Sequence, residues 1–314
     1  MEKKETFLII GASVLDILAQ PVDTDVFQIG SVCAEHSRMH TGGDALNEAT
    51  VLSALGADVR LISKWGTDYA GNCIQVHCRN HGIDTSFARI ESSLETGINL
   101  VLVDSSGERH FITSKHGSLR KLHPQDIPGE ALSGRQYLCF ASIFVFPAFD
   151  DTALAKLFAK AKSQGLILCA DMTKRKNGET LSDMKRSLAL LDFVFPNYEE
   201  ARLLTEQTDY DDIADAFLSC NVGCVVLKAG AKGCFLKTTG ERHWIPPYPN
   251  AHCLDTTGAG DTFTACFLYA HSLGMSLREC GQFANAGASI CIEQIGATGG
   301  IRDAQQVWER YRNC

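Results

Sequence analysis

The sequence lacks the features that mark several large classes of protein. Its 314 residues include only 8 prolines, and no apolar run approaches the roughly 20 residues that a membrane-spanning helix needs. Lysine and arginine number 29 against 37 aspartates and glutamates, which gives a formal net charge of −8. A chain without a basic excess is not expected to bind nucleic acid or an anionic membrane as its main role. A small molecule is therefore the expected ligand.

The 13 cysteines do not indicate a disulfide framework. Their number is odd, no C-x-x-C occurs, and most lie inside apolar runs such as YLCFAS and ACFLYA. We interpret them as small core residues of a protein in a reducing, cytoplasmic compartment. A redox or metal site on Cys220 and Cys224 is the alternative, but no nearby His or Cys completes a ligand set. The N-terminal apolar run resembles a signal peptide, but it is short and Asp16 follows it before any small-residue cleavage site. We therefore predict that this run is a buried first strand.

Short apolar runs alternate with longer amphipathic segments over most of the chain. This alternation predicts an α/β fold, in which a mainly parallel sheet carries helices on both faces. Strands are predicted at residues 7–10, 59–63, 137–142, 166–171, 193–196 and 224–228, and helices at 45–56, 70–82, 151–164 and 198–205.

Two regions depart from this rhythm. Residues 21–41 and 94–113 carry the alternation of apolar and polar residues that is typical of strands, and the second has a Ser-Gly turn in its middle. They predict a small antiparallel sheet outside the main one, placed as a lid over a cleft. After Asp261 the pattern is helical to the end of the chain.

The stretch LDTTGAGDTF (254–263) carries the clearest chemical signal. It predicts a turn followed by a helix that starts near Asp261, so the amides of the Gly-Ala-Gly turn (258–260) are expected at a helix N-terminus. Free donors and the helix dipole favour an anion at such a place. Asp261 would stay ionised there and could accept a proton from a hydroxyl. The alternative is that Asp255 and Asp261 only cap a turn and a helix.

Five ordered elements resemble one known family. DTTGAGDTF resembles the C-terminal signature of the PfkB carbohydrate kinase family, and TGGDALNEATVLSALGADVRLISKWGTDYAGN (41–72) resembles its N-terminal signature. PNYEEARLL (196–204), VVLKAGAKGCFL (225–236) and FANAGASICIEQIGATGGI (283–301) are similar to its N-x-x-E element, its nucleotide-side strand and its adenine loop. The resemblance covers nearly the whole chain.

This resemblance implies a ribokinase-like fold. The expected architecture is a three-layer α/β/α core with a mainly parallel central sheet and a small antiparallel β lid. A single kinase domain would span residues 1–314, with the lid formed by about 12–41 and 94–113.

The resemblance also assigns roles to individual residues. Asp261 corresponds to the catalytic base, which removes a proton from the substrate hydroxyl as that hydroxyl attacks the γ-phosphate of ATP. Glu200 is implied to organise Mg²⁺ through water, and Asp255 with Thr257 to hold a monovalent cation such as K⁺. The alternatives are an ordinary surface acid for Glu200 and a strand-end cation for Lys228. The anion hole is matched by Gly258, Ala259 and Gly260, and the nucleotide side by Asn197, Glu200, Lys228, Gly230, Gly233 and Asn285.

The substrate side is implied by positions near the N-terminus. Asp44 departs from the family pattern, in which many members carry a small or basic residue, and it either binds a further hydroxyl or faces solvent. Residues 174–176 (Lys174, Arg175 and Lys176) follow a strand end and either meet an anionic group of the substrate or form a solvated basic loop. The positions that match the family's sugar-binding residues are Asp16, Gly42, Gly43 and Asn47.

The function implied by the resemblance is transfer of the γ-phosphate of ATP to a hydroxyl of a monosaccharide or sugar acid. A nucleoside kinase of the same family is one alternative, and it would need an aromatic platform, for which Phe27, Phe144 and Phe146 are the candidates. A non-catalytic sugar-binding regulator is the other, although it would not need both Asp261 and the glycine turn. The lid strands could pair between subunits, so we expect a homodimer.

Overall fold

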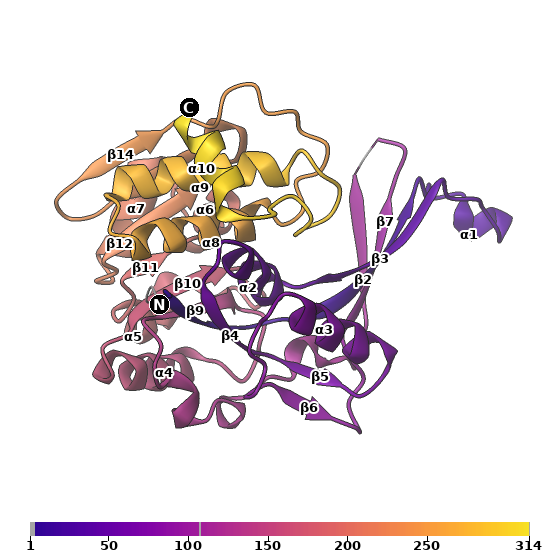
Figure 1. The fold of residues 1–314 in the computed structure, drawn as a ribbon, viewed down its shortest axis with the longest axis horizontal. Helices are drawn as coiled ribbons and strands as arrows, with labels where there is room; N and C mark the ends of the chain where they lie inside the picture. The colour runs from indigo at the N-terminus through magenta and orange to yellow at the C-terminus, as the bar shows by residue number, and fades with distance from the viewer. Residues whose placement is uncertain (1–3, 107, 314) are drawn as a thin grey trace.

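The computed structural model describes residues 4–106 and 108–313, and it shows a large body from which a small sheet projects to one side (Figure 1). The body is built on an eight-stranded sheet of order β14-β13-β12-β11-β10-β9-β1-β4. Pairing is parallel from β4 to β12 and antiparallel from β12 through β13 to β14. The strands are β1 (Thr6–Ile10), β4 (Asp58–Ile62), β9 (Tyr137–Ile143), β10 (Ile167–Met172), β11 (Phe193–Val194), β12 (Cys224–Lys228), β13 (Cys234–Lys237) and β14 (Arg242–Ile245).

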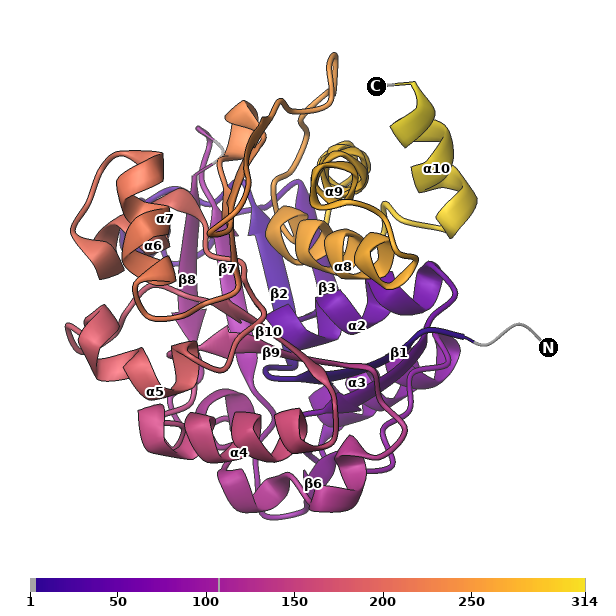
Figure 2. The same ribbon diagram turned by 90° about the vertical axis from the view of Figure 1, so that its left-hand side faces the viewer.

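Helices cover both faces of this sheet, and Figure 2 shows the two groups on opposite sides. Each face has its own cluster of buried apolar side chains, and β9, which is covered on both faces, is buried along its whole length. The first face carries α2 (Asp44–Ala54), α3 (Tyr69–Asn80), α8 (Ala259–Ser272), α9 (Leu277–Cys291) and α10 (Ala304–Arg312). The second carries α4 (Asp151–Ser163), α5 (Lys185–Leu188), α6 (Tyr198–Thr205) and α7 (Tyr210–Leu218). The predicted three-layer α/β/α core is confirmed.

The small sheet projects from the body as the lid, in the order β3-β2-β7-β8 (Figure 1). Its outer pairs, β2 with β3 and β7 with β8, are antiparallel as predicted, whereas β2 and β7 pair in parallel. The strands are β2 (Val14–Gln20), β3 (His36–Gly42), β7 (Ile98–Val103) and β8 (Arg109–Thr113). The predicted turn between β7 and β8 includes Gly107, which lies outside the described residues.

One predicted strand region is wrong in part. Residues 21–35 are not a strand: they contain the short helix α1 (Val26–Ile29) at the outer end of the lid. Pro21 has no N–H to donate to a strand partner, so β2 ends before it, and the DTD sequence at 23–25 favours a turn and a helix start. The sequence also gave no signal for the two-stranded sheet of β5 (Lys64–Gly66) and β6 (Arg89–Glu91).

The fold brings several chain segments to one edge of the main sheet. β10 carries Asp171 near its carboxyl end and β12 ends at Lys228, while α8 and α2 begin at the same edge and pack against each other. In open parallel sheets, ligands bind at this carboxyl edge. Among the described residues, no helix is long and apolar enough to cross a membrane.

Candidate active site

Asp261 lies in the first turn of α8, as predicted. Gly258 precedes the helix with a positive φ of 71°, and a Cβ there would lie 2.4 Å from the carbonyl oxygen of Ala297, so only glycine fits. Of the three amides predicted to bind an anion, Ala259 N–H already donates to Thr256 O at 3.2 Å. Within the described part of the chain, neither the Gly258 nor the Gly260 amide donates to another group. These two donors remain for a ligand.

Asn47 holds the carboxyl group of Asp261. The Asn47 side chain comes from the first turns of α2 and donates from Nδ2 to Asp261 Oδ2 at 2.7 Å. Its backbone N–H donates to Gly43 O at 2.9 Å, which fixes the start of α2. Gly43 has a φ of 100°, and a Cβ there would lie 2.6 Å from Ala12 O. The predicted substrate residue Asn47 is therefore also a positioning contact for the predicted base.

Lys228 borders the same helix N-terminus. A Cβ at Gly260 would lie 3.4 Å from Lys228 Nζ, and this ammonium pairs with the buried carboxylate of Asp171. Thr264 Oγ1 also donates to Asp171 Oδ2 at 2.9 Å. Burial would lower the pKa of Lys228, but the charges of Asp171 and Glu200 outweigh it and hold that pKa above its usual value. Lys228 is therefore a cation at neutral pH.

Two acids of α2, Asp44 and Glu48, lie close enough to Asp261 to affect its charge. Asp44 accepts from Ser142 Oγ at 3.0 Å, and burial raises its pKa to about 6. Glu48 is fully buried one helical turn later, both of its carboxyl oxygens lack a partner, and burial raises its pKa well above the usual value. Removal from water, and then the negative charge of Asp44, raise the pKa of Asp261 to about 8. The expectation that Asp261 stays ionised at the helix N-terminus is therefore wrong at neutral pH, because burial outweighs the helix dipole. Asp44 is partly buried and its carboxylate is held by Ser142, so it is not a freely solvated side chain.

Asn197 and Glu200 form a reciprocal cap at the start of α6. Asn197 N–H donates to Glu200 Oε2 at 2.9 Å, and Glu200 N–H donates to Asn197 Oδ1 at 2.9 Å. Burial raises the pKa of Glu200 to about 7. Glu200 is therefore not an ordinary surface acid, because its side chain is held by the cap and the positive charge of Lys228 acts on its carboxyl group.

Asp255, predicted to hold a monovalent cation with Thr257, is surrounded by donors. Its carboxylate accepts from Thr257 N–H at 2.8 Å, Thr257 Oγ1 at 2.7 Å and Gly296 N–H at 2.9 Å, and it pairs with Arg109 of the lid strand β8. Burial alone would raise the pKa of Asp255, but these donors hold it below the usual value. The cation site stays a prediction, and an ion at this carboxylate would compete with Arg109.

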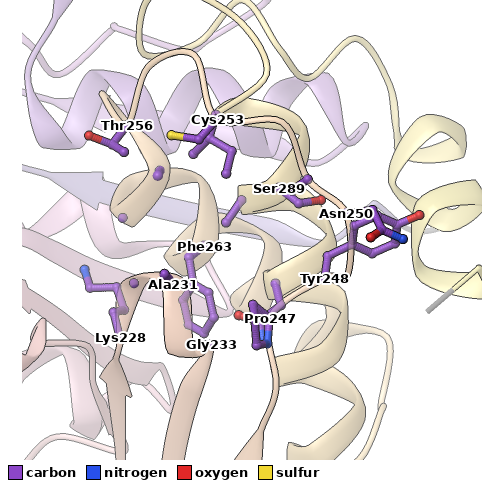
Figure 3. A pocket seen from close by; sticks show the side chains of 17 residues that line it. Lys228, Ala231, Gly233, Pro247, Tyr248, Asn250, Cys253, Thr256, Phe263 and Ser289 are labelled. Carbon is purple, nitrogen blue, oxygen red and sulfur yellow. The ribbon is translucent and has the colours of Figure 1, made fainter. Parts of the chain in front are cut away.

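A cavity of about 410 Å³ adjoins the N-terminus of α8. Figure 3 shows Lys228 on one side of it, Tyr248 and Asn250 on the other, and the Phe263 ring between them. The predicted nucleotide residues Lys228, Gly230, Gly233 and Asn285 all line this cavity. Asn285 also donates from Nδ2 to Pro246 O at 2.8 Å and so anchors one wall. Sequence reasoning did not single out Tyr248, and it interpreted Phe263 only as a core-facing helix residue, because a wall made by a loop and a helix is visible only after folding.

The lid supplies Asp16, which lies against the start of α2. A Cβ at Gly42 would lie 2.1 Å from Asp16 Oδ2, so the glycine leaves room for this carboxylate. Asn99 on β7 donates from Nδ2 to Asp16 Oδ1 at 2.9 Å. The sequence did not single out Asn99, because its place beside Asp16 depends on the parallel pairing of β2 and β7.

The basic segment 174–176 does not reach this site. Lys174 and Lys176 are exposed, and Arg175 donates to Glu179 O at 3.0 Å and pairs with Glu206 at 3.7 Å. The solvated-loop interpretation of this segment is the one that the structure supports.

The candidate aromatic platform residues lie elsewhere as well. Phe27 is 82% exposed on α1, Phe146 is buried in the core, and Phe144 packs against that core. None of the three lines the cavity beside α8.

The arrangement as a whole can perform acid–base chemistry beside an anion. A carboxylate that accepts protons is held by an amide, two free backbone donors and a lysine lie next to it, and an enclosed cavity opens on one side. On the other side lies the carboxylate of Asp16, which belongs to the lid.

Comparison with known proteins gives consistent matches over the whole chain. The family model described as "pfkB family carbohydrate kinase" matches residues 7–304. A protein of Archaeoglobus fulgidus described as an uncharacterized sugar kinase is 28% identical over 251 residues, which cover 80% of this chain and 97% of the relative. A nucleoside kinase of Methanothermobacter thermautotrophicus is 25% identical over 313 residues, which cover 99% of this chain and 97% of the relative.

A solved structure has the same fold. The ribokinase of Arabidopsis thaliana, complexed with ribose and ATP, matches this chain with a TM-score of 0.84 at 24% identity, and the match covers 99% of each chain. The predicted ribokinase-like fold is thereby confirmed.

Proposed function

The chain belongs to the pfkB family of carbohydrate kinases, and from that premise we propose that it transfers the γ-phosphate of ATP to a hydroxyl of a monosaccharide or sugar acid. The observation that carries this proposal is the carboxyl group of Asp261, held by Asn47 next to the free Gly258 and Gly260 amides. A proton acceptor and an anion site stand side by side there. This is the pair of groups that phosphoryl transfer to an alcohol needs.

In the proposed reaction, Asp261 takes the proton of the substrate hydroxyl. The hydroxyl oxygen forms a bond to the γ-phosphorus, the bond from that phosphorus to the β–γ bridging oxygen breaks, and ADP leaves with the bonding electron pair. The amides of Gly258 and Gly260, with the Lys228 ammonium nearby, stabilise the negative charge on the transferred group. The proton then leaves Asp261 to solvent when the product departs.

The residues present fit a nucleotide and its metal. The cavity lined by Lys228, Gly230, Gly233 and Asn285 is proposed to hold ATP. Magnesium, when bound, neutralises charge on the phosphates. Glu200 is proposed to hold it through water, because its Oε2 accepts from Asn197 and its other carboxyl oxygen makes no hydrogen bond among the described residues. Asp16, Gly42, Gly43 and Asn47 are proposed to bind the acceptor substrate.

A nucleoside kinase remains the second candidate, and the similarity to the nucleoside kinase of Methanothermobacter thermautotrophicus favours it.

The lid also supports the proposed homodimer. Met39, Leu100 and Ile112 lie in one register row across its sheet, and all three are exposed. Sedimentation velocity measures whether two copies associate.

Turnover by the purified protein tests the proposed function. With Mg-ATP, release of ADP is expected to depend on the addition of a substrate from a panel of ketoses, aldoses, sugar acids and nucleosides, and to be much slower without one. Coupled spectrophotometry of ADP measures this directly. If nucleotide binds while no panel member raises the rate, the non-catalytic sugar-binding alternative gains the support instead.

The pH dependence of turnover should report the acids around Asp261. Because the pKa of Asp261 is raised to about 8, the base is increasingly protonated at lower pH, and kcat/KM is expected to rise about tenfold per pH unit toward pH 8 and then level off. Asp44→Asn removes a neighbouring negative charge and should move this limb to lower pH. Asp212→Asn, an exposed carboxylate on α7, is the matched control and should leave the limb in place. An unmoved limb in Asp44→Asn would contradict the proposed coupling.

A further inference from the structure

The lid places an arginine on a buried carboxylate of the body. Arg109 belongs to the lid strand β8, and its guanidinium pairs with Asp255, which lies in the turn before α8. The Asp255 side chain is only 4% exposed. A carboxylate that is buried without a cation strongly destabilises a fold. The contact therefore supplies a positive charge that Asp255 needs.

Hydrogen-bond donors already surround the Asp255 carboxylate. Its Oδ1 accepts from Thr257 N–H at 2.8 Å, from Thr257 Oγ1 at 2.7 Å and from an N–H of Arg109. Its Oδ2 accepts from Gly296 N–H at 2.9 Å. A carboxylate has about four acceptor positions. The donors in place match these positions, so a metal ion could bind only by displacing one of them.

The carbonyl oxygens beside this turn have a donor as well. Backbone carbonyl oxygens are typical ligands of K⁺. Cys291 Sγ, at the end of α9, lies within hydrogen-bonding distance of Thr257 O at 3.4 Å and of Ala297 O at 3.5 Å. Ala297 O also faces the turn, because a Cβ at Gly258 would lie 2.4 Å from it. The chain thus surrounds Asp255 with donors of its own, and only the guanidinium among them is charged.

The charge at Asp255 matters because of what its turn carries. Residues 255–258 lead directly into α8, and the amides of Gly258 and Gly260 are the donors that remain there for an anion among the described residues. An unneutralised carboxylate in the same turn would repel that anion. A guanidinium in a protein is always charged. Arg109 therefore neutralises Asp255 at any salt concentration.

We propose that Arg109 is the built-in cation of the anion-binding turn, so that the chain does not need the monovalent ion that the family resemblance implies. This inference rests on the proposed function and adds a positioning residue to its site. Arg109 acts on the bound phosphates through Asp255 and the turn rather than by direct contact. Nucleotide binding is then independent of K⁺.

Nucleotide binding by the wild-type chain tests the inference without turnover. Isothermal titration with AMP-PNP, a non-hydrolysable ATP analogue, and Mg²⁺ would be run in choline chloride and in potassium chloride at equal ionic strength. The two dissociation constants are expected to agree within about threefold. A dissociation constant that K⁺ lowers by more than this would overturn the inference, because Arg109 would then not suffice.

A variant without the guanidinium tests the role of Arg109 itself. Arg109→Met removes the charge and keeps most of the side-chain volume. In choline chloride it is expected to bind the analogue about tenfold more weakly, and millimolar guanidinium or K⁺ should restore most of the loss by binding beside Asp255. Unchanged affinity would overturn the assignment, and so would a loss that neither cation restores, since a merely structural role does not respond to a free cation. Arg38→Met, at an exposed position of the lid strand β3, is the matched control and should show neither the loss nor the response.

The melting temperature of the ligand-free chain gives a second measurement. Arg109→Met should melt a few degrees below the wild type in choline chloride and recover in part with guanidinium. The double variant Arg109→Met/Asp255→Asn lacks both charges and should not respond. An equal response of the single and double variants would overturn the assignment to Asp255. The comparison of salts on the wild type decides the inference even if Arg109→Met does not fold.

Failure of the inference and failure of the proposed function give different results. A chain that binds the analogue equally well with and without K⁺, but releases no ADP with any substrate of the panel, loses the kinase proposal and keeps Arg109 as its cation. A chain that phosphorylates a sugar only in the presence of K⁺ keeps the kinase proposal and loses the inference.

Discussion

Asp261→Asn is expected to lower kcat by about 10²–10⁴-fold, the usual contribution of a positioned general base. Asparagine keeps the size of the side chain, and its Oδ1 can still accept from Asn47 Nδ2, which now lies 2.7 Å from the carboxylate. The substituted amide cannot take up the proton of the substrate hydroxyl. The chemical step should therefore fail while the site keeps its shape.

The separation of binding from turnover makes this prediction specific. Sugar and nucleotide affinities of Asp261→Asn, measured by titration calorimetry, should stay within a few-fold of the wild type, and the melting temperature should not fall. Asp212→Asn makes the same chemical change on the surface of α7 and should keep full activity. A turnover number of Asp261→Asn close to that of the wild type would remove Asp261 from its role as the base.

Lys228→Met is expected to destabilise the protein by about 3–5 kcal/mol, because it leaves the buried Asp171 carboxylate without its cation. Methionine keeps most of the side-chain volume, so the loss reports charge rather than packing. Thr264 Oγ1 still donates to Asp171 but carries no positive charge. Nucleotide affinity should fall as well, since Lys228 lines the cavity beside α8.

Urea unfolding of a double-mutant cycle measures the stability effect. Asp171→Asn removes the buried negative charge that Lys228→Met leaves unpaired. The double variant Lys228→Met/Asp171→Asn should therefore recover most of the stability that Lys228→Met loses. Lys162→Met breaks the half-exposed pair with Asp192 and is the matched control, with an expected cost below about 1 kcal/mol. Equal losses at Lys162 and Lys228 would show that burial of Asp171 does not govern the effect.

The main sheet and the glycine turn could be predicted from the sequence because their signals are local. Apolar runs such as 137–142 are short enough to be buried strands, and the turn at 258–260 needs its glycine at Gly258, where φ is positive. The N-x-x-E spacing of Asn197 and Glu200 is likewise local, since a reciprocal cap forms within one helical turn. These features depend on neighbours in the chain.

The parts that sequence reasoning missed depend on contacts between distant residues. Asp171 ends an apolar run, which is a weak signal, and only the adjacent β12 strand places Lys228 against it. Asn99 contacts Asp16 across 83 positions of the chain, because β2 and β7 pair in parallel. No turn signal in the sequence predicts this pairing. In the sequence Glu48 cannot be told from an ordinary exposed helix residue. It is buried only because α2 packs against the sheet. The predicted strand at 21–35 fails for a local reason instead, because Pro21 and the turn residues that follow it outweigh the alternation.

The contacts of Asp255 carry a thermodynamic consequence. Its carboxylate contacts Arg109 of the lid, the turn before α8 and the loop at Gly296. A movement of the lid that breaks the contact with Arg109 would therefore also change the contacts that order the turn. Coupling free energies are reciprocal: if a ligand under the lid tightens binding of another at the turn, the second must tighten binding of the first by the same factor. If sugar and nucleotide bind as proposed and are coupled through these contacts, each raises the affinity of the other by the same factor.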